Sequence, residues 1–180
     1  GAAEMAMLLT GQYPEGWQGK RLDHPITALA GSETGELTRD GVQRLLVGTP
    51  NDESAWGTGF IPGDAIVSTS RAMGVANALD SIVVKHASGG NSTLLFKTYA
   101  QGRKKWQANT VHVVWFDEEP PLDIYTEGVT RTNAHMGPVF LTFTPLLGMS
   151  AVVLRFIQPD PDDPGAKDRS VTTMTINDAD

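Results

Sequence analysis

The sequence contains no cysteine, and this absence excludes disulfide bonds and metal sites built from thiolates. Its four histidines, at positions 24, 86, 112 and 135, lack the spacing of metal ligands, so we do not expect a structural zinc. The sequence also lacks the run of roughly 18 apolar residues that a membrane span needs, and no basic start precedes an apolar stretch. We therefore expect no membrane partner and a cytoplasmic location.

Positive charge is scarce: 14 lysines and arginines stand against 21 acidic residues, giving a formal charge of −7. Affinity for nucleic-acid backbones comes largely from lysine and arginine, which argues against a surface broadly built for DNA. Any DNA contact must be local. The densest basic stretch is Arg103-Lys104-Lys105-Trp106, although a solvated loop face explains this stretch equally well.

A phosphate-binding loop of the form G-x-x-x-x-G-K-[ST] is also missing. Gly19-Lys20 is followed by Arg21 instead of serine or threonine, and Pro14 occupies the position of the first loop glycine. The glycine clusters at 57–59 and 89–90 have no Lys-Ser/Thr behind them and are typical of turns. The sequence thus offers no loop of its own to hold nucleotide phosphates.

A chain of 180 residues with 40% hydrophobic content is large enough to bury one core, so we expect a single domain over residues 1–180. Strand and helix patterns alternate, which favours an α/β sandwich. The expected helices cover residues 1–11, 38–48 with Thr38 as N-cap, a short stretch from 71 to 78, and a segment after 121. The expected strands cover residues 25–30, a hairpin of 81–86 with 92–99, 111–116, a segment from 137 to its end at 142–144, and 171–176, while 150–156 fits either type.

The apolar run 111–116 ends abruptly in Asp117, Glu118 and Glu119, followed by Pro120-Pro121. Such a run is typical of a strand covered on both faces of a parallel sheet, and ligands in these sheets bind beyond the carboxyl ends of the strands. An apolar strand followed by Asp-Glu is the Walker B pattern, in which the aspartate supports Mg²⁺ and the glutamate polarises the attacking water. Carboxylates are also favourable at helix N-termini, so a simple capping role stays open.

A second apolar strand, beginning at Gly137, ends in hydroxyls at Thr142 and Thr144 before the Pro145 turn. Together with the segments 117–127 and Thr130-Arg131-Thr132, this strand resembles the ATPase domain of the large terminase subunit, the motor that packages DNA into tailed-phage heads. The resemblance covers most of the chain and is specific in its later half. It implies an α/β, P-loop NTPase-like fold of the ASCE type: a three-layer sandwich with a mainly parallel central sheet, incomplete here.

The resemblance also implies roles for the acids and hydroxyls. Asp117 matches the aspartate that holds Mg²⁺, and Glu118 matches the catalytic glutamate. Thr142 and Thr144 match the coupling motif that senses the γ-phosphate of ATP. Glu119 is ambiguous, because it could tune Glu118 at the nucleotide or cap the following helix.

Ring ATPases of this kind bring an arginine to the nucleotide, where it stabilises charge on the transferred phosphoryl group. Arg103 is our candidate for this arginine finger and Arg131 is the runner-up. Simple surface solubility explains either residue at least as well.

In the resembling family, the phosphate-binding loop would lie just upstream of the first helix, and a nuclease domain would follow the C-terminus. We therefore expect a truncated ATPase domain that begins just after the Walker A loop and is inactive by itself. The implied ligands are ATP and Mg²⁺, and the implied partners are double-stranded DNA, the portal protein, the small terminase subunit and further copies in a ring. Two alternatives stay open: a helicase-like nucleic-acid translocase, and a non-catalytic remnant that serves in assembly.

Overall fold

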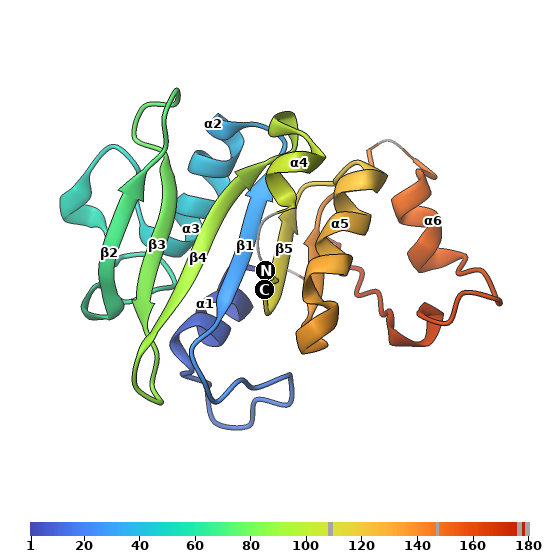
Figure 1. The fold of residues 1–180 in the computed structure, drawn as a ribbon, viewed down its shortest axis with the longest axis horizontal. Helices are drawn as coiled ribbons and strands as arrows, with labels where there is room; N and C mark the ends of the chain where they lie inside the picture. Colours follow the sequence, from blue (N-terminus) through green and yellow to red (C-terminus); the bar gives the residue numbers. More distant parts are fainter. Residues whose placement is uncertain (108–109, 147, 176–177, 179–180) are drawn as a thin grey trace. The chain divides into compact units, whose positions relative to one another are not determined.

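The computed structural model describes residues 1–107, 110–146, 148–175 and 178. The chain divides into two compact units, Gly1–Thr144 and Pro145–Asp180, which are treated separately below. The first unit is built on a six-stranded sheet in the order β2-β3-β4-β1-β5-β6 (Figure 1). Its strands are β1 (Thr27–Ser32), β2 (Ile66–Arg71), β3 (Leu79–Lys85), β4 (Asn91–Thr98), β5 (Val113–Asp117) and β6 (Val139–Thr142).

Strand β1 pairs in parallel with β4 and β5, and β5 pairs in parallel with β6. Strand β3 is antiparallel to both of its neighbours, β2 and β4. The expected α/β fold with a mainly parallel sheet is therefore confirmed, as is the hairpin, which β3 and β4 form.

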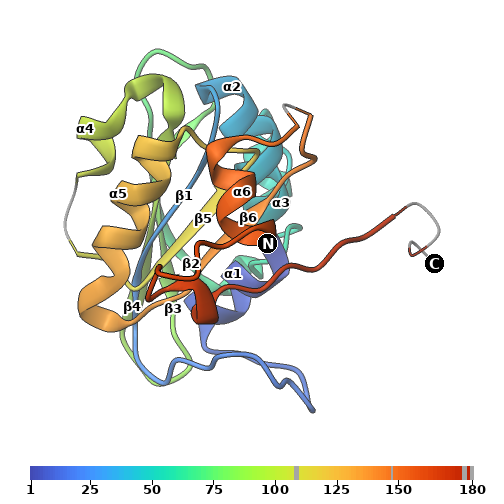
Figure 2. The same cartoon turned by 90° about the vertical axis from the view of Figure 1, so that its right-hand side faces the viewer.

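Helices cover both faces of this sheet, giving three layers (Figure 2). Helices α4 and α5 lie on one face, and α1, α2 and α3 lie on the other. The α-helices of this unit are α1 (Ala2–Thr10), α2 (Gly35–Leu37), α3 (Arg44–Val47), α4 (Arg103–Trp106) and α5 (Leu122–Thr132). A π-helical segment η1 (Thr38–Gln43) joins α2 to α3, and short 3₁₀ segments are η2 (Glu53–Ala55), η3 (Gly63–Ala65), η4 (Tyr99–Gln101) and η5 (Asn133–His135).

Strand β5 is apolar from Val113 to Phe116, as is typical of a strand whose two faces are covered. Val113 and Trp115 belong to the core that α1 and α3 close, while the Phe116 ring stacks on Trp106 of α4 with centroids 5.1 Å apart. Successive side chains of a strand point to opposite faces. Asp117 therefore follows Trp115 on the α1 side of the sheet, at the carboxyl end of the strand.

The helix predicted over residues 38–48 begins earlier, at Gly35. Thr34 is its N-cap, and the Thr34 side chain accepts a 3.2 Å hydrogen bond from the backbone N–H of Leu37. The prediction of Thr38 as N-cap is wrong: Thr38 is buried, and its hydroxyl instead donates to the carbonyl of Lys97 in β4. Thr34 and Thr38 have equal capping ability as residue types. Thr34 is the cap because the helix begins directly after β1 ends at Ser32.

The short helix predicted over residues 71–78 is also wrong. Arg71 ends strand β2, and the N–H of Ala72 bonds to the carbonyl of Ala78 to close a turn. Gly74 and Asn77 have φ angles of 88° and 60°. These left-handed conformations cannot continue a right-handed helix.

The second unit contains α6 (Ala151–Ile157), which settles the segment around residue 150 as a helix. The Ser150 hydroxyl caps α6 by accepting from the N–H of Val153. A 3₁₀ segment, η6, covers Ala166–Asp168, and Arg169 forms a 2.7 Å ion pair with Asp163. The strand predicted over 171–176 is wrong for 171–175, where alternation alone supplied no neighbouring strand to pair with, and residue 176 lies outside the described residues.

Within the described part of the chain, no helix is long and apolar enough to cross a membrane.

Candidate functional site

The two segments singled out in the sequence meet at the carboxyl end of the sheet. Asp117 at the end of β5 and Thr142 at the end of β6 are paired in register across adjacent parallel strands. The Thr142 hydroxyl donates a 2.9 Å hydrogen bond to Oδ1 of Asp117 and accepts a 2.8 Å bond from the indole Nε1 of Trp115. The acid is thus oriented by a chain of two side-chain hydrogen bonds.

The second carboxylate oxygen of Asp117 faces the π-helical segment η1. A Cβ atom added at Gly41 would lie 3.1 Å from Oδ2 of Asp117, so the backbone of η1 passes close to the carboxylate. π-helical turns are rare and occur frequently at functional sites. The absence of a side chain at Gly41 leaves Oδ2 accessible.

The N-terminal end of α1 lies at the same place. A side chain at Gly1 would overlap the indole ring of Trp115, at 2.5 Å from its nearest atoms. Burial raises the pKa of Asp117, and the hydrogen bond from Thr142 acts against this rise.

Glu118 adopts an unusual backbone conformation for a residue with a side chain. Its φ angle is 65°, in the left-handed region, and its N–H donates a 2.9 Å bond to the carbonyl of Thr142. The Glu118 side chain is exposed at the sheet edge. Burial raises the pKa of Glu118, and the nearby negative charges of Asp117 and Glu33 add to this rise.

The other two residues predicted at the nucleotide are less closely placed. Glu119 continues the acidic run and is half-buried before Pro120. Thr144 is exposed and lies beyond the end of β6. Asp117 therefore receives its threonine hydrogen bond from Thr142, and the roles of Glu119 and Thr144 stay predictions.

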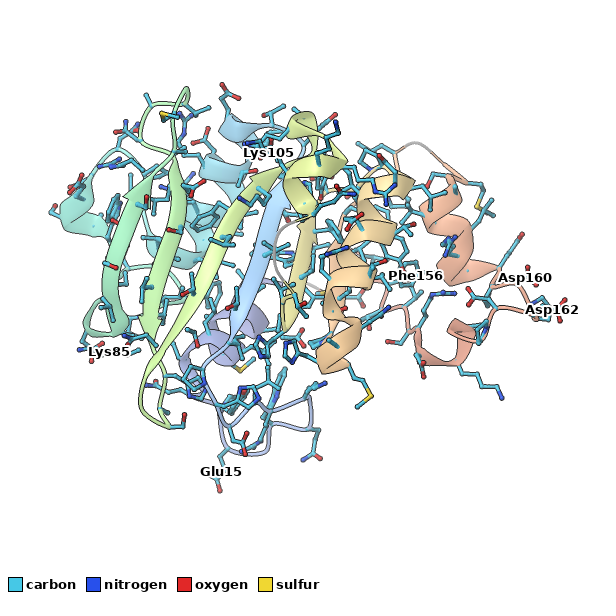
Figure 3. The ribbon with its side chains drawn as sticks, in the orientation of Figure 1. Glu15, Lys85, Lys105, Phe156, Asp160 and Asp162 are labelled. Atoms are coloured by element: carbon cyan, nitrogen blue, oxygen red, sulfur yellow. The ribbon has the colours of Figure 1, made fainter. Side chains whose placement is uncertain are left out.

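The two candidate arginines converge on one acid. Arg103 in α4 and Arg131 in α5 form ion pairs of 2.8 Å and 2.7 Å with Glu127, whose side chain is only 2% exposed. The basic stretch 103–106 is not a loop but helix α4, with Trp106 buried beneath it. Lys105 projects from α4 at one end of the sheet, while Lys85 and Glu15 lie at the opposite end (Figure 3). The finger role of either arginine stays a prediction.

Sequence reasoning missed three residues around the acids. Glu33 directly follows β1, so the rule about carboxyl ends of strands could have found it. Tyr99 donates its hydroxyl to backbone carbonyls of Asp117 and Glu118. The Ser32 hydroxyl is buried without a hydrogen-bond partner among the described residues. Ser32 follows Gly31, which pairs with Phe116 in β5, so Ser32 and Asp117 come next along two adjacent parallel strands.

These oxygen atoms fit a magnesium ion bound together with a nucleotide. Within the described residues, no group of three or more His, Cys, Asp or Glu side chains forms a protein-only metal site. Mg²⁺ commonly takes one or two carboxylates and completes its octahedron with water and substrate phosphates. Asp117, with the Ser32 and Thr142 hydroxyls beside it, supplies oxygen donors of this kind.

A mainly parallel sheet between two helical layers, with a carboxylate and a hydroxyl paired at the carboxyl ends of neighbouring strands, defines an α/β fold of the P-loop NTPase type. Residues 1–180 match the family described as the T4likevirus-type terminase large subunit, N-terminal. The chain belongs to this terminase family.

Two curated relatives are described as terminase large subunits. The terminase large subunit of Salmonella phage P22 is 43% identical over 196 aligned residues, covering 99% of this chain and 38% of the relative. The terminase large subunit of Enterobacteria phage LP7 is 30% identical over 155 residues, covering 83% of this chain and 30% of the relative. The chain thus spans about two fifths or less of these relatives. No solved structure matches the chain significantly.

Proposed function

We propose that this chain forms the ATP-hydrolysing core of a terminase large subunit, the motor that drives double-stranded viral DNA into a procapsid. The observation that carries the proposal is the hydrogen bond between Thr142 and Asp117, made at the carboxyl ends of two adjacent parallel strands and followed at once by Glu118. Acid, hydroxyl and a second acid at one sheet edge are the parts that Mg²⁺-dependent nucleotide hydrolysis requires.

Each residue has a chemical task in this proposal. Asp117 holds Mg²⁺, with the Ser32 and Thr142 hydroxyls beside it, and the ion neutralises charge on the β- and γ-phosphates when bound. Glu118 orients the attacking water and accepts its proton, while the water oxygen bonds to the γ-phosphorus and the bond to the β–γ bridging oxygen breaks. The products are ADP and inorganic phosphate. A raised pKa suits Glu118 to accepting a proton.

Thr142 is suited to sensing the γ-phosphate, since its hydroxyl accepts a hydrogen bond from Trp115 and donates one to Asp117. We propose that Thr144 contributes a second hydroxyl, and that Glu119 lies at the rim of the same site.

The proposed partners follow from the motor function: double-stranded DNA, the portal protein, the small terminase subunit and other copies of the large subunit in a ring. Lys104 and Lys105 are exposed on α4, in a chain whose formal charge is −7. They are the local cations we propose for contact with DNA phosphates.

The test is Mg²⁺-dependent ATP hydrolysis by the full-length large subunit that carries this chain. Glu118→Gln should lower kcat by about 100-fold or more, because it removes the general base, while ATP affinity stays within a few-fold. Glu15→Gln is the matched control, since it is the same substitution at a residue that lies at the opposite end of the sheet. Wild-type turnover in Glu118→Gln, or no turnover in the unmodified protein, would contradict the proposal and favour a non-catalytic role.

A further inference from the structure

The Tyr99 side chain is buried behind the acidic edge of the sheet and makes its hydrogen bonds with the turn that carries the acids. Tyr99 begins η4, immediately after β4 ends at Thr98. Its hydroxyl oxygen lies 2.8 Å from the carbonyl oxygen of Glu118 and 2.9 Å from that of Asp117. A third carbonyl, that of Gly31 in β1, lies 3.3 Å away.

The hydroxyl must act as a donor here, because all three neighbours are backbone carbonyl oxygens that can only accept. Burial raises the pKa of Tyr99, and the charges of Asp117, Glu118 and Glu33 act in the same direction. The phenol therefore keeps its proton throughout the working pH range. One hydroxyl thus contacts the backbone carbonyls of Gly31 in β1, of Asp117 at the end of β5 and of Glu118 just beyond it.

The contact matters because of the backbone at Glu118. A non-glycine residue at a φ of 65° is uncommon and persists where surrounding interactions hold it. The N–H of Glu118 is held from β6, by the carbonyl of Thr142, and the carbonyl of Glu118 is held from the other side by Tyr99. Tyr99 reaches this point from β4, which is separated from β5 by β1.

The ring itself has little freedom. Tyr99 is 6% exposed, and its ring lies 5.9 Å from that of Trp106 and 6.1 Å from that of Phe116, measured between centroids. Beneath them, a side chain at Gly31 would collide with the carbonyl of Lys97. The hydroxyl is therefore delivered to the Asp117–Glu118 turn by a packed, rigid support.

We propose that Tyr99 is a positioning residue for the reaction: it locks the left-handed turn at Glu118 and so fixes where the Glu118 carboxylate stands over the attacking water. This inference rests on the proposed function of Glu118 as general base. It assigns a role to a residue outside the acidic and hydroxyl motifs, in the 3₁₀ segment that follows β4.

The experiment compares Tyr99→Phe with Tyr125→Phe in the full-length large subunit. Both changes remove one buried tyrosine hydroxyl beside Phe116, since the Tyr125 ring lies 6.3 Å from Phe116 on α5. Tyr99→Phe should lower kcat for Mg²⁺-dependent ATP hydrolysis by about 10-fold or more, with KM within about two-fold, as expected for loss of catalytic geometry without loss of binding. Tyr125→Phe should leave kcat within about two-fold.

Hydrogen–deuterium exchange supplies a readout that does not depend on turnover. In Tyr99→Phe the backbone amides of 113–119 should exchange at least several-fold faster than in Tyr125→Phe, because the turn loses its anchor from β4. Should Tyr99→Phe unfold, 3-fluorotyrosine at position 99 keeps the donor and should keep kcat within a few-fold.

The outcomes separate the two claims when Glu118→Gln is measured in the same series. Loss of turnover in Glu118→Gln together with wild-type kcat and wild-type exchange in Tyr99→Phe overturns the positioning role and leaves the proposed function intact. Unchanged turnover in Glu118→Gln overturns the proposed function. A similar drop of kcat in Tyr125→Phe also overturns the inference, because it would trace the effect to general packing around Phe116.

Discussion

Thr142 and Asp117 are joined by a 2.9 Å hydrogen bond that links the ends of two neighbouring parallel strands. The same threonine oxygen accepts from the indole of Trp115, so one hydroxyl serves both a buried donor and a carboxylate. The fold and the proposed chemistry therefore depend on the same oxygen atom, so one substitution should change both stability and ATP turnover.

Thr142→Val keeps the shape of the side chain but removes the hydroxyl. The Trp115 N–H then has no acceptor and Asp117 loses its donor, so the free energy of unfolding should fall by about 1–3 kcal/mol. Urea denaturation measures this change, and ATP turnover should fall with it because Asp117 is no longer oriented. Thr144→Val is the comparison: Thr144 is exposed, and its replacement should change stability by less than about 0.5 kcal/mol. Equal losses in both variants would contradict the assigned hydrogen bond.

Asp117→Asn should make the nucleotide-free protein more stable at neutral pH. Burial raises the pKa of Asp117 in the folded state, so folding favours the protonated form. The wild-type protein therefore loses stability as pH rises from the ordinary aspartate pKa through the raised folded-state value, and Asn escapes this loss.

The measurement is the thermal midpoint of each protein between pH 3 and 8. The thermal midpoint of Asp117→Asn should equal that of the wild type at the acidic end of this range. At pH values above the raised pKa, it should be higher than that of the wild type by on the order of a few degrees. Addition of Mg²⁺ and ATP should raise the midpoint of the wild type more than that of the variant. A constant difference at all pH values would show that the carboxylate charge is not its source.

Much of this site follows from the sequence because its two strands carry strong local signals. The apolar run before Asp117 predicted a strand buried on both faces, which is β5. The apolar run before Thr142 predicted a second strand, which is β6. Parallel pairing then brought their ends together. Local pattern and tertiary structure agree here, since the acids and hydroxyls lie at the carboxyl ends of the strands, where ligands bind in open α/β sheets.

Other features depend on contacts between distant segments and left little trace in the sequence. Ser32 belongs to the site because β1 lies next to β5 in the sheet, and Tyr99 because its hydroxyl reaches past β1 to Asp117 from the segment that follows β4. The N-cap is Thr34 and not the predicted Thr38, because the Thr38 hydroxyl is buried against β4 and donates to the carbonyl of Lys97. Exposed Arg103 looked available for an incoming phosphate, but tertiary packing placed Glu127 beside it.

Glu127→Gln tests this ion-pair network. The buried Glu127 carboxylate pairs with Arg103 and Arg131, and its loss leaves two arginines without their shared anion. Because both arginines keep some contact with water, we expect a loss of about 2 kcal/mol in the free energy of unfolding at pH 7. Glu15→Gln, at an exposed loop position, should change stability by less than about 0.5 kcal/mol.

The pH dependence of this loss has a defined sign. Burial acts to raise the pKa of Glu127, but hydrogen bonds from Arg103 and Gln107 and the charges of both arginines outweigh it, and the pKa is lowered. The ionised pair therefore stabilises the fold above the ordinary glutamate pKa, and this contribution disappears as pH falls through the lowered folded-state value. The gap between wild type and Glu127→Gln should close over that acidic window. A gap that persists at pH 2 would assign the loss to packing instead of charge.

Gly128→Ala sets helix propensity against packing. Alanine in the middle of α5 should favour the helix by about 1 kcal/mol. An added Cβ, however, would lie 2.5 Å from the Phe116 ring and 3.3 Å from Val114, beneath the strand that carries Asp117. Overpacking of this kind typically costs about 1–3 kcal/mol, so we expect a net loss of stability. Thr126→Ala, at an exposed position on the same helix, should change stability by less than about 0.5 kcal/mol.

A double-mutant cycle identifies the partner of this clash. Phe116→Leu removes the ring atoms that a Cβ at position 128 would meet, so Gly128→Ala should cost less in that background than in the wild type, with a coupling of at least about 0.5 kcal/mol. Chemical denaturation of the four proteins measures the coupling. Additive effects would mean that the glycine serves some purpose other than the close approach of α5 to β5, because two residues in contact should not respond independently.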